Sequence, residues 1–170
     1  MRKFIYTEAA TLDAYVAPFQ KMEAEGLLPW AMSCIDNPTL ERWLEITVAG
    51  VLLCCNDEAS GKLLGCAHFT RFQGSAWRFD FTAFHAGFAC AAQQAQGGFD
   101  YMFERHSASA IVGITPAQFR HAWGLAEACG FEIVTRLPGA CWLARKQRFV
   151  DGVMVMCTPQ TLRNAQEKGK

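Results

Sequence analysis

The sequence contains no hydrophobic run long enough to cross a membrane and no excess of charge of either sign. Its longest apolar stretch, Ile46–Cys55, is interrupted by Thr47 and Gly50 and is well short of the ~20 residues that a membrane-spanning helix needs. Lys and Arg together number 16, as do Asp and Glu, so the net charge is zero. Domains that bind nucleic acid usually have a pI above ~9. We therefore expect neither a membrane nor a nucleic acid as a partner.

The sequence also lacks the patterns of a metal site and of a secreted protein. Its eight cysteines include no Cys-x-x-Cys pair, so a zinc ribbon is not expected. Most of them have apolar neighbours, among which a reduced cysteine packs as a small hydrophobic residue. The first ten residues have two basic side chains but no apolar core of ~7 to 15 residues, as a signal peptide would have. We expect a cytoplasmic protein with reduced cysteines and no bound metal.

The composition and length predict one folded domain. The 170 residues are 51% hydrophobic and 19% charged, and a chain of this length is typical of a single domain. We find no linker, internal repeat or low-complexity segment. We predict a domain over residues 1–159 and a polar tail over residues 160–170 that frays.

The apolar pattern predicts an alternation of strands and helices in the order β α α β β β α β α β β. Helical spacing predicts helices over Thr11–Met22, Pro38–Val48, Phe88–Phe103 and Thr115–Cys129. Strand-forming runs predict strands over Lys3–Tyr6, Val51–Cys55, Lys62–Phe72, Ala76–Phe84, Ala108–Ile114, Phe131–Arg136 and Val150–Cys157, with Ala140–Ala144 continuing the sheet after a turn or bulge at Pro138 and Gly139.

Three local signals refine the helices. Thr115, Pro116 and Gln118 match a capping box with proline at the first helical position, so we expect a helix to begin there. Gly130 is placed to end that helix as a C-terminal cap. The Gly97-Gly98 pair weakens the preceding helix and predicts a bend.

From Lys62 to Pro159 these segments resemble the GNAT superfamily of acyl-CoA-dependent N-acyltransferases. FDFTAFHAGF (79–88) stands where the family has a strand that leads into a phosphate-binding loop, and ASAIVGITPAQFRHAWGLAEACGF (108–131) matches the next strand, helix and closing Gly-Phe pair. The Asp151-Gly152 pair precedes the last strand, as in the family. The resemblance implies an α/β (α+β) fold, with a mixed, mainly antiparallel sheet of about six to seven strands and about four flanking helices.

The resemblance also implies an activity and a site. The protein would bind acetyl-CoA or another acyl-CoA as co-substrate and transfer the acyl group to an amine of a small molecule or peptide. The co-substrate would lie where the strand ending near Phe84 diverges from the strand ending near Ile114, with its diphosphate on a helix N-terminus. The residues implied at the co-substrate are Phe84, His85, Ala86, Gly87, Phe88, Ala89, Cys90, Ile114, Phe119, Arg120 and Trp123.

The sequence departs from the family at three places. The usual phosphate loop, Q/R-x-x-G-x-G/A, is replaced by HAGFACAA with the single Gly87. Phe119 stands where the family often has an asparagine, and Ala126 where it often has a tyrosine acid. A leaving thiolate has a pKa near ~8.5 and can depart without an acid, so catalysis does not require that tyrosine. The alternatives are a catalytically inactive GNAT-like module that binds a ligand or a protein, or a homodimer formed through exposed aromatic residues.

Acyl transfer to an amine needs a general base, and two residues are our candidates for catalysis. Asp80 is the polar member of an apolar strand; alternatively it pairs with Arg71 or Arg78. His85 stands where the cofactor loop begins; alternatively it caps the helix or contacts a phosphate.

The other candidates have more ordinary interpretations as well. We interpret His68 and His121 as packed or surface histidines. Cys90 is either reactive at a helix N-terminus or a buried small residue. Arg120 and Trp123 are expected near the adenine or the 3′-phosphate, although core packing also explains Trp123.

The charge is unevenly distributed along the chain. Residues 1–60 carry four basic and nine acidic side chains, a net charge of −5, and residues 61–170 carry +5. The second part suits an anionic ligand. The acidic first part favours a cationic amine as acceptor through electrostatic steering.

Overall fold

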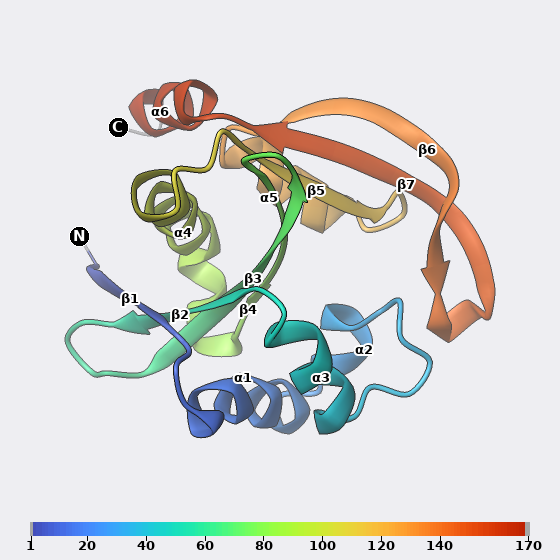
Figure 1. The fold of residues 1–170 in the computed structure, drawn as a ribbon, viewed down its shortest axis with the longest axis horizontal. Helices are drawn as coiled ribbons and strands as arrows, with labels where there is room; N and C mark the ends of the chain where they lie inside the picture. The colour runs from blue at the N-terminus through green and yellow to red at the C-terminus, as the bar shows by residue number, and fades with distance from the viewer. Residues whose placement is uncertain (1, 169–170) are drawn as a thin grey trace.

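A seven-stranded sheet runs through the computed structural model, which describes residues 2–168 (Figure 1). The strand order is β1-β2-β3-β4-β5-β7-β6. All neighbouring strands are antiparallel except β4 and β5, which are parallel. The predicted mixed, mainly antiparallel sheet is therefore confirmed. Its strands are β1 (Phe4–Glu8), β2 (Val51–Asp57), β3 (Leu63–Gln73), β4 (Ala76–Ala83), β5 (Ala110–Pro116), β6 (Glu132–Leu143) and β7 (Arg148–Cys157).

Helices cover both faces of the sheet. Within the described residues there are six α-helices and two short 3₁₀ helices: α1 (Leu12–Ala24), α2 (Leu28–Ala31), α3 (Leu40–Thr47), η1 (His85–Cys90), α4 (Ala91–Arg105), α5 (Arg120–Ala128), η2 (Ala144–Lys146) and α6 (Pro159–Lys168). None of the helices in this part of the chain is both long and apolar enough to span a membrane. In Figure 1, α1, α2 and α3 lie together at one side of β3 and β4, and α4 lies at the other.

Two apolar clusters join the helices to opposite faces of the sheet. Leu52, Cys66 and Phe84 pack with the residues of α1 and α3. The larger cluster joins Phe69 on β3 and Phe99 on α4 with residues of α5 and α6. Because side chains alternate along a strand, the two faces of β3 and β4 differ: one packs under α4, and the other faces α1, α2 and α3.

The predicted alternation of β4 is confirmed. Trp77 is buried in the α4 cluster, and Phe79 and Phe81 pack against it. Arg78 and Asp80 are exposed on the opposite face. The side of the sheet near α2 therefore carries the charged side chains of β4.

Two predicted helix starts are wrong. Thr115 and Pro116 remain in β5, paired with Val153 and Gly152 of β7, and α5 begins only at Arg120 without a side-chain cap. Sheet pairing thus overrides the capping-box pattern. Similarly, α3 begins at Leu40 rather than Pro38, because the Thr39 side chain accepts a hydrogen bond from the Arg42 N–H at 3.2 Å.

The helix α4 continues from Ala91 to Arg105 through Gly97 and Gly98, where a bend was predicted. Both glycines serve close packing. A Cβ at Gly97 would collide with the phenol of Tyr6, whose hydroxyl donates to the Gln94 carbonyl at 2.9 Å. The two glycines allow α4 to approach β1 and β2.

The predicted fraying tail is also wrong for residues 160–168, which belong to α6; residues 169–170 lie outside the described part of the chain. Leu162 is fully buried in the main core. The Gln166 side chain donates to Asp100 on α4 at 2.6 Å. The sequence of α6 has too few apolar residues to predict a helix. The burial of Leu162 nevertheless anchors α6 to the core.

Candidate functional site

The strands β4 and β5 diverge after a short stretch of pairing. They pair only over Ala76–Arg78 and Ala110–Val112, so the Phe79–Ala83 edge has no strand partner on the β5 side among the described residues. Phe79 marks the point of divergence. A Cβ at Gly113 of β5 would lie 2.7 Å from the Phe79 ring. The Phe79 ring can therefore pack beside β5 only because residue 113 is a glycine.

Asp80 lies on this open stretch, on the face toward α2. Its carboxylate forms an ion pair with Arg78 at 3.1 Å, and both side chains are about half exposed. Of the two partners considered from the sequence, the structure therefore shows Arg78. An exposed pair of this kind contributes little to stability, so the carboxylate can exchange Arg78 for another cation.

His68 lies directly opposite Asp80 in the β3–β4 pairing. It is only 5% exposed, and its Nε2 has no hydrogen-bond partner among the described residues. Burial lowers the pKa of His68, while the charge of Asp80 opposes this shift. The imidazole is thus neutral near pH 7 and leaves the negative charge of Asp80 uncompensated from that side.

The loop after α2 lies near this carboxylate. Partial desolvation and, next, the negative charge of Asp80 raise the pKa of the Cys34 thiol. Cys34 follows α2 by three residues, and α2 packs against β4, so α2 and this loop border the Asp80 side of the divergence. Sequence analysis did not single out this wall, because a helix of four residues, α2, gives no periodic pattern.

The loop implied for the diphosphate begins at an N–H group that is already bonded. The His85 N–H donates to Glu25 Oε2 at 2.6 Å, and His85 Nδ1 lies 3.7 Å from the same oxygen. Lys21 pairs with the other carboxylate oxygen at 2.8 Å. The His85 ring itself is largely exposed. A carboxylate from the end of α1 thus occupies the position at which a helix N-terminus would attract a phosphate.

Gly87 in this loop is needed for packing against β3. It is buried, and a Cβ there would collide with the Leu64 carbonyl oxygen. Its own carbonyl accepts from Gln94 Nε2 at 2.7 Å and from the Cys90 thiol at 3.4 Å. Cys90 is therefore the buried small residue of the two alternatives.

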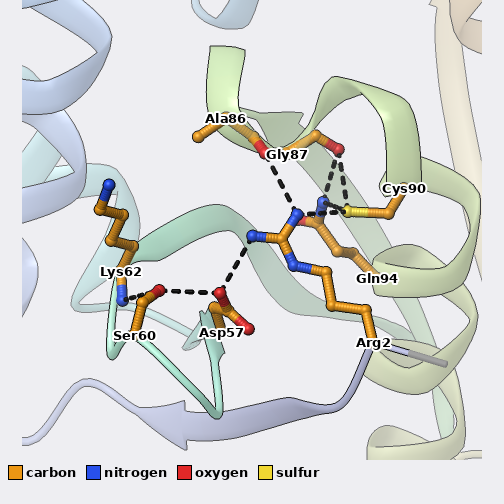
Figure 2. Close-up of polar contacts among 8 residues, drawn as sticks. All are labelled: Arg2, Asp57, Ser60, Lys62, Ala86, Gly87, Cys90 and Gln94. Carbon is orange, nitrogen blue, oxygen red and sulfur yellow. Dashed lines mark hydrogen bonds and ion pairs between the residues drawn. The ribbon is translucent and has the colours of Figure 1, made fainter.

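Arg2 connects the end of the loop to β2 (Figure 2). Its guanidinium donates to the Ala86 carbonyl at 3.5 Å and to the Cys90 sulfur at 3.7 Å, and it pairs with Asp57 at 3.1 Å. Ser60 donates to the same Asp57 oxygen at 2.7 Å. These contacts fix the loop His85–Cys90 against β2. Four residues of this loop are nevertheless exposed: His85, Ala86, Phe88 and Ala89.

The predicted residues on β5 and α5 separate into an exposed and a packed group. Arg120 is exposed, and Ile114 is half-buried and pairs with Met154. Trp123 donates to the Ala117 carbonyl at 3.2 Å and packs against the main core. Of its two interpretations, the structure therefore shows core packing. Phe119 packs against Trp30 of α2, with 5.8 Å between ring centroids, and so joins α5 to the α2 wall.

The residues present fit CoA along β4 better than at the loop. The open edge of Phe79–Ala83 offers backbone N–H and C=O groups to an amide-containing arm. At the loop, by contrast, the Glu25 carboxylate must be displaced or bypassed by a diphosphate. Glu25 escaped the sequence analysis because 60 residues separate it from His85.

The Glu25 contacts predict a specific dependence of stability on pH. Burial raises the pKa of Glu25, but the hydrogen bonds from Lys21 and from the His85 N–H outweigh this effect and hold its pKa below the ordinary value of 4.5. Its stabilisation is therefore complete above about pH 5 and is lost as the pH falls through the lowered pKa of the folded state. We expect Glu25→Gln to be less stable near pH 7 by on the order of 1 kcal/mol and to lose less further stability on acidification.

Urea denaturation at several pH values between about 3 and 7 checks this expectation. Glu23→Gln, on the same helix but exposed, is the matched control. Curves of stability against pH that run parallel for the wild type and Glu25→Gln would contradict the assigned role.

Comparisons with known proteins identify the fold. The sequence matches no protein-family model and no curated protein. Among solved structures, the chain is similar to a GCN5-related N-acetyltransferase from Brucella melitensis, with a TM-score of 0.74 and 15% identity over 96% of this chain and 81% of that one. The spermidine N-acetyltransferase from Vibrio cholerae, solved with CoA and spermine, gives a TM-score of 0.72 and 13% identity over 95% and 98%.

A third structure agrees with these two. The ribosomal-protein-S5-alanine acetyltransferase from Vibrio fischeri gives a TM-score of 0.69 and 14% identity over 91% of this chain and 92% of that one. All three neighbours are acetyltransferases, and each covers nearly the whole of this chain. The chain therefore has the fold of the GNAT superfamily, as the sequence motifs predicted.

Proposed function

We propose that this protein is an acyl-CoA-dependent N-acyltransferase that transfers an acetyl or other acyl group to an amine of a small molecule or a peptide. The observation that supports this best is the placement of Asp80 on the stretch of β4 that has left β5. An open strand edge and a carboxylate thus occupy the same five residues, Phe79–Ala83. The solved neighbour with CoA and spermine supports the same assignment.

The chain would contribute binding, orientation and proton transfer. The backbone of Phe79–Ala83 would pair with the amide groups of the pantetheine arm. When bound, the acyl-CoA would supply the acyl group as a thioester. Asp80 would accept the proton that the acceptor ammonium must release, since only the neutral amine has a lone pair for attack. Holding the two reactants together would provide most of the rate enhancement.

A second candidate is an inactive GNAT-like module, and specific observations favour it. The Glu25 carboxylate holds the first N–H of the loop, and Phe119 and Ala126 replace two polar residues of the family pattern. In such a module these residues would fill the cleft rather than serve a co-substrate.

Binding of the co-substrate separates the two candidates. We expect calorimetric and thermal-shift titrations with acetyl-CoA to show saturable binding; ligand at ~100 times Kd would stabilise the fold by roughly 2.7 kcal/mol. Acyl transfer is then measured as CoA release in the presence of amines. Absence of any binding at millimolar acetyl-CoA would rule out the transferase and leave the inactive module.

A further inference from the structure

The exposed tip of the β6–β7 hairpin carries a group of cations. Arg145 and Lys146 of η2 and Arg148 at the start of β7 are exposed. None of them forms an ion pair with an acidic side chain within residues 2–168.

Hydrogen bonds hold this tip against the loop after α2. The Ala144 N–H donates to the Ser33 carbonyl at 3.0 Å. The Trp142 indole and the Gln147 amide both donate to Asp36 Oδ1, at 2.9 and 2.8 Å. Asp36 Oδ1 thus anchors the hairpin, and the tip has a defined position beside α2 and the loop that follows it.

The tip also contacts α2 itself and the segment before α5. The Arg145 guanidinium lies 4.4 Å from the centroid of the Trp30 ring, and Trp30 in turn packs against Phe119. Lys146 Nζ donates to the Gln118 side chain at 2.8 Å. Stacking on an aromatic face leaves the N–H donors of Arg145 free for an anion.

These cations lie beside the helix that packs on the strand of Asp80. Arg145 stacks on Trp30 of α2, Ala144 is bonded to Ser33 in the loop after α2, and α2 packs against β4. An amine that reaches Asp80 from the hairpin side therefore passes the cationic tip.

Of the acidic side chains of residues 1–60, Asp36 contacts this tip, through the neutral donors Trp142 and Gln147. Four of the nine pair with the four basic side chains of the same segment, Glu25 with Lys21, Glu45 with Arg42, Asp57 with Arg2 and Glu58 with Lys3, and Glu8 pairs with His106. The cationic acceptor favoured by the net charge of residues 1–60 is opposed by the local charges of the hairpin tip.

We propose that the acceptor amine belongs to a molecule that also carries negative charge, namely a peptide with acidic residues next to its reacting N-terminus, rather than a polyamine. The amine would reach Asp80 while the acidic residues contact Arg145 and Arg148. This inference rests on the proposed acyl transfer and specifies the substrate class of the same site.

The test compares three acceptors with acetyl-CoA as donor: a short peptide with a free N-terminal alanine followed by aspartates, the same peptide with arginines in place of the aspartates, and spermidine. We expect kcat/KM for the acidic peptide to be about tenfold or more above that for the other two, because steering by fixed charges changes association rates by this order. The advantage should shrink as salt is added.

Charge-neutralising variants locate the effect. The double variant Arg145→Gln and Arg148→Gln should lose most of the preference for the acidic peptide while its KM for acetyl-CoA stays the same. Arg163→Gln, on the exposed face of α6, is the matched control and should retain the preference.

The outcomes are distinguishable. Equal or better transfer to spermidine or to the arginine peptide overturns the inference and leaves the transferase standing. A change confined to the KM for acetyl-CoA overturns it too, because the cations would then serve the co-substrate. Absence of both transfer and acetyl-CoA binding refutes the proposed function itself.

Discussion

Replacing Asp80 by asparagine should lower kcat for acyl transfer by about 100-fold or more, the usual contribution of a positioned general base. The amide keeps the size of the side chain and its contact with solvent but cannot accept the amine proton. Binding of acetyl-CoA should change little, because the arm is proposed to pair with the backbone of β4. Steady-state kinetics with a saturating amine, together with calorimetry for acetyl-CoA, measure the two effects separately.

Arg78→Gln is the matched control for this variant. It removes the same ion pair, at 3.1 Å, but leaves the carboxylate in place. We expect its kcat to remain within a few-fold of the wild type, since an exposed pair is worth at most about 1 kcal/mol. Equal losses in both variants would assign the effect to the ion pair, and an unchanged kcat in Asp80→Asn would exclude Asp80 as the base.

The part of the fold that followed from sequence is the part where local pattern and tertiary packing agree. The apolar alternation of β4 matched its buried face, and Gly130 was correctly placed as the residue that ends α5, where its φ of +89° suits a residue without a side chain. In both cases the residues of one short segment determine the local structure. Thr115 and Pro116 show the opposite case, because their pairing with β7 outweighs a strong local helix signal.

The site was less accessible from sequence because it is made by contacts between distant segments. Asp80 is a candidate that its strand pattern indicates, whereas its neighbour His68 is defined only by the β3–β4 register. Glu25 meets His85, and Trp30 meets both Phe119 and Arg145, through the path of the chain rather than through any spacing. No motif could indicate that a carboxylate lies at the start of the loop, and whether a diphosphate displaces it is decided by the binding titration.

The aromatic cluster behind the divergence leads to the second large effect. Phe99 of α4 is 1% exposed, and its ring lies 4.9 Å from the centroids of both Phe79 and Phe131 and 6.3 Å from that of Phe69. We expect Phe99→Ala to lower the free energy of unfolding by about 3 to 5 kcal/mol, the range for removing a buried phenylalanine ring. Urea denaturation at neutral pH measures this loss directly.

The same substitution should also weaken acetyl-CoA binding, because Phe79 is the residue at which β4 leaves β5 and Phe99 supports its ring. Phe72→Ala is the control: that ring is 48% exposed, so its removal should cost well under half as much stability and leave binding unchanged. A loss below about 1 kcal/mol for Phe99→Ala would show that the cluster does not stabilise the divergence. Normal binding by a folded but destabilised variant would show instead that the open edge of β4 is maintained by its pairing with β3 alone.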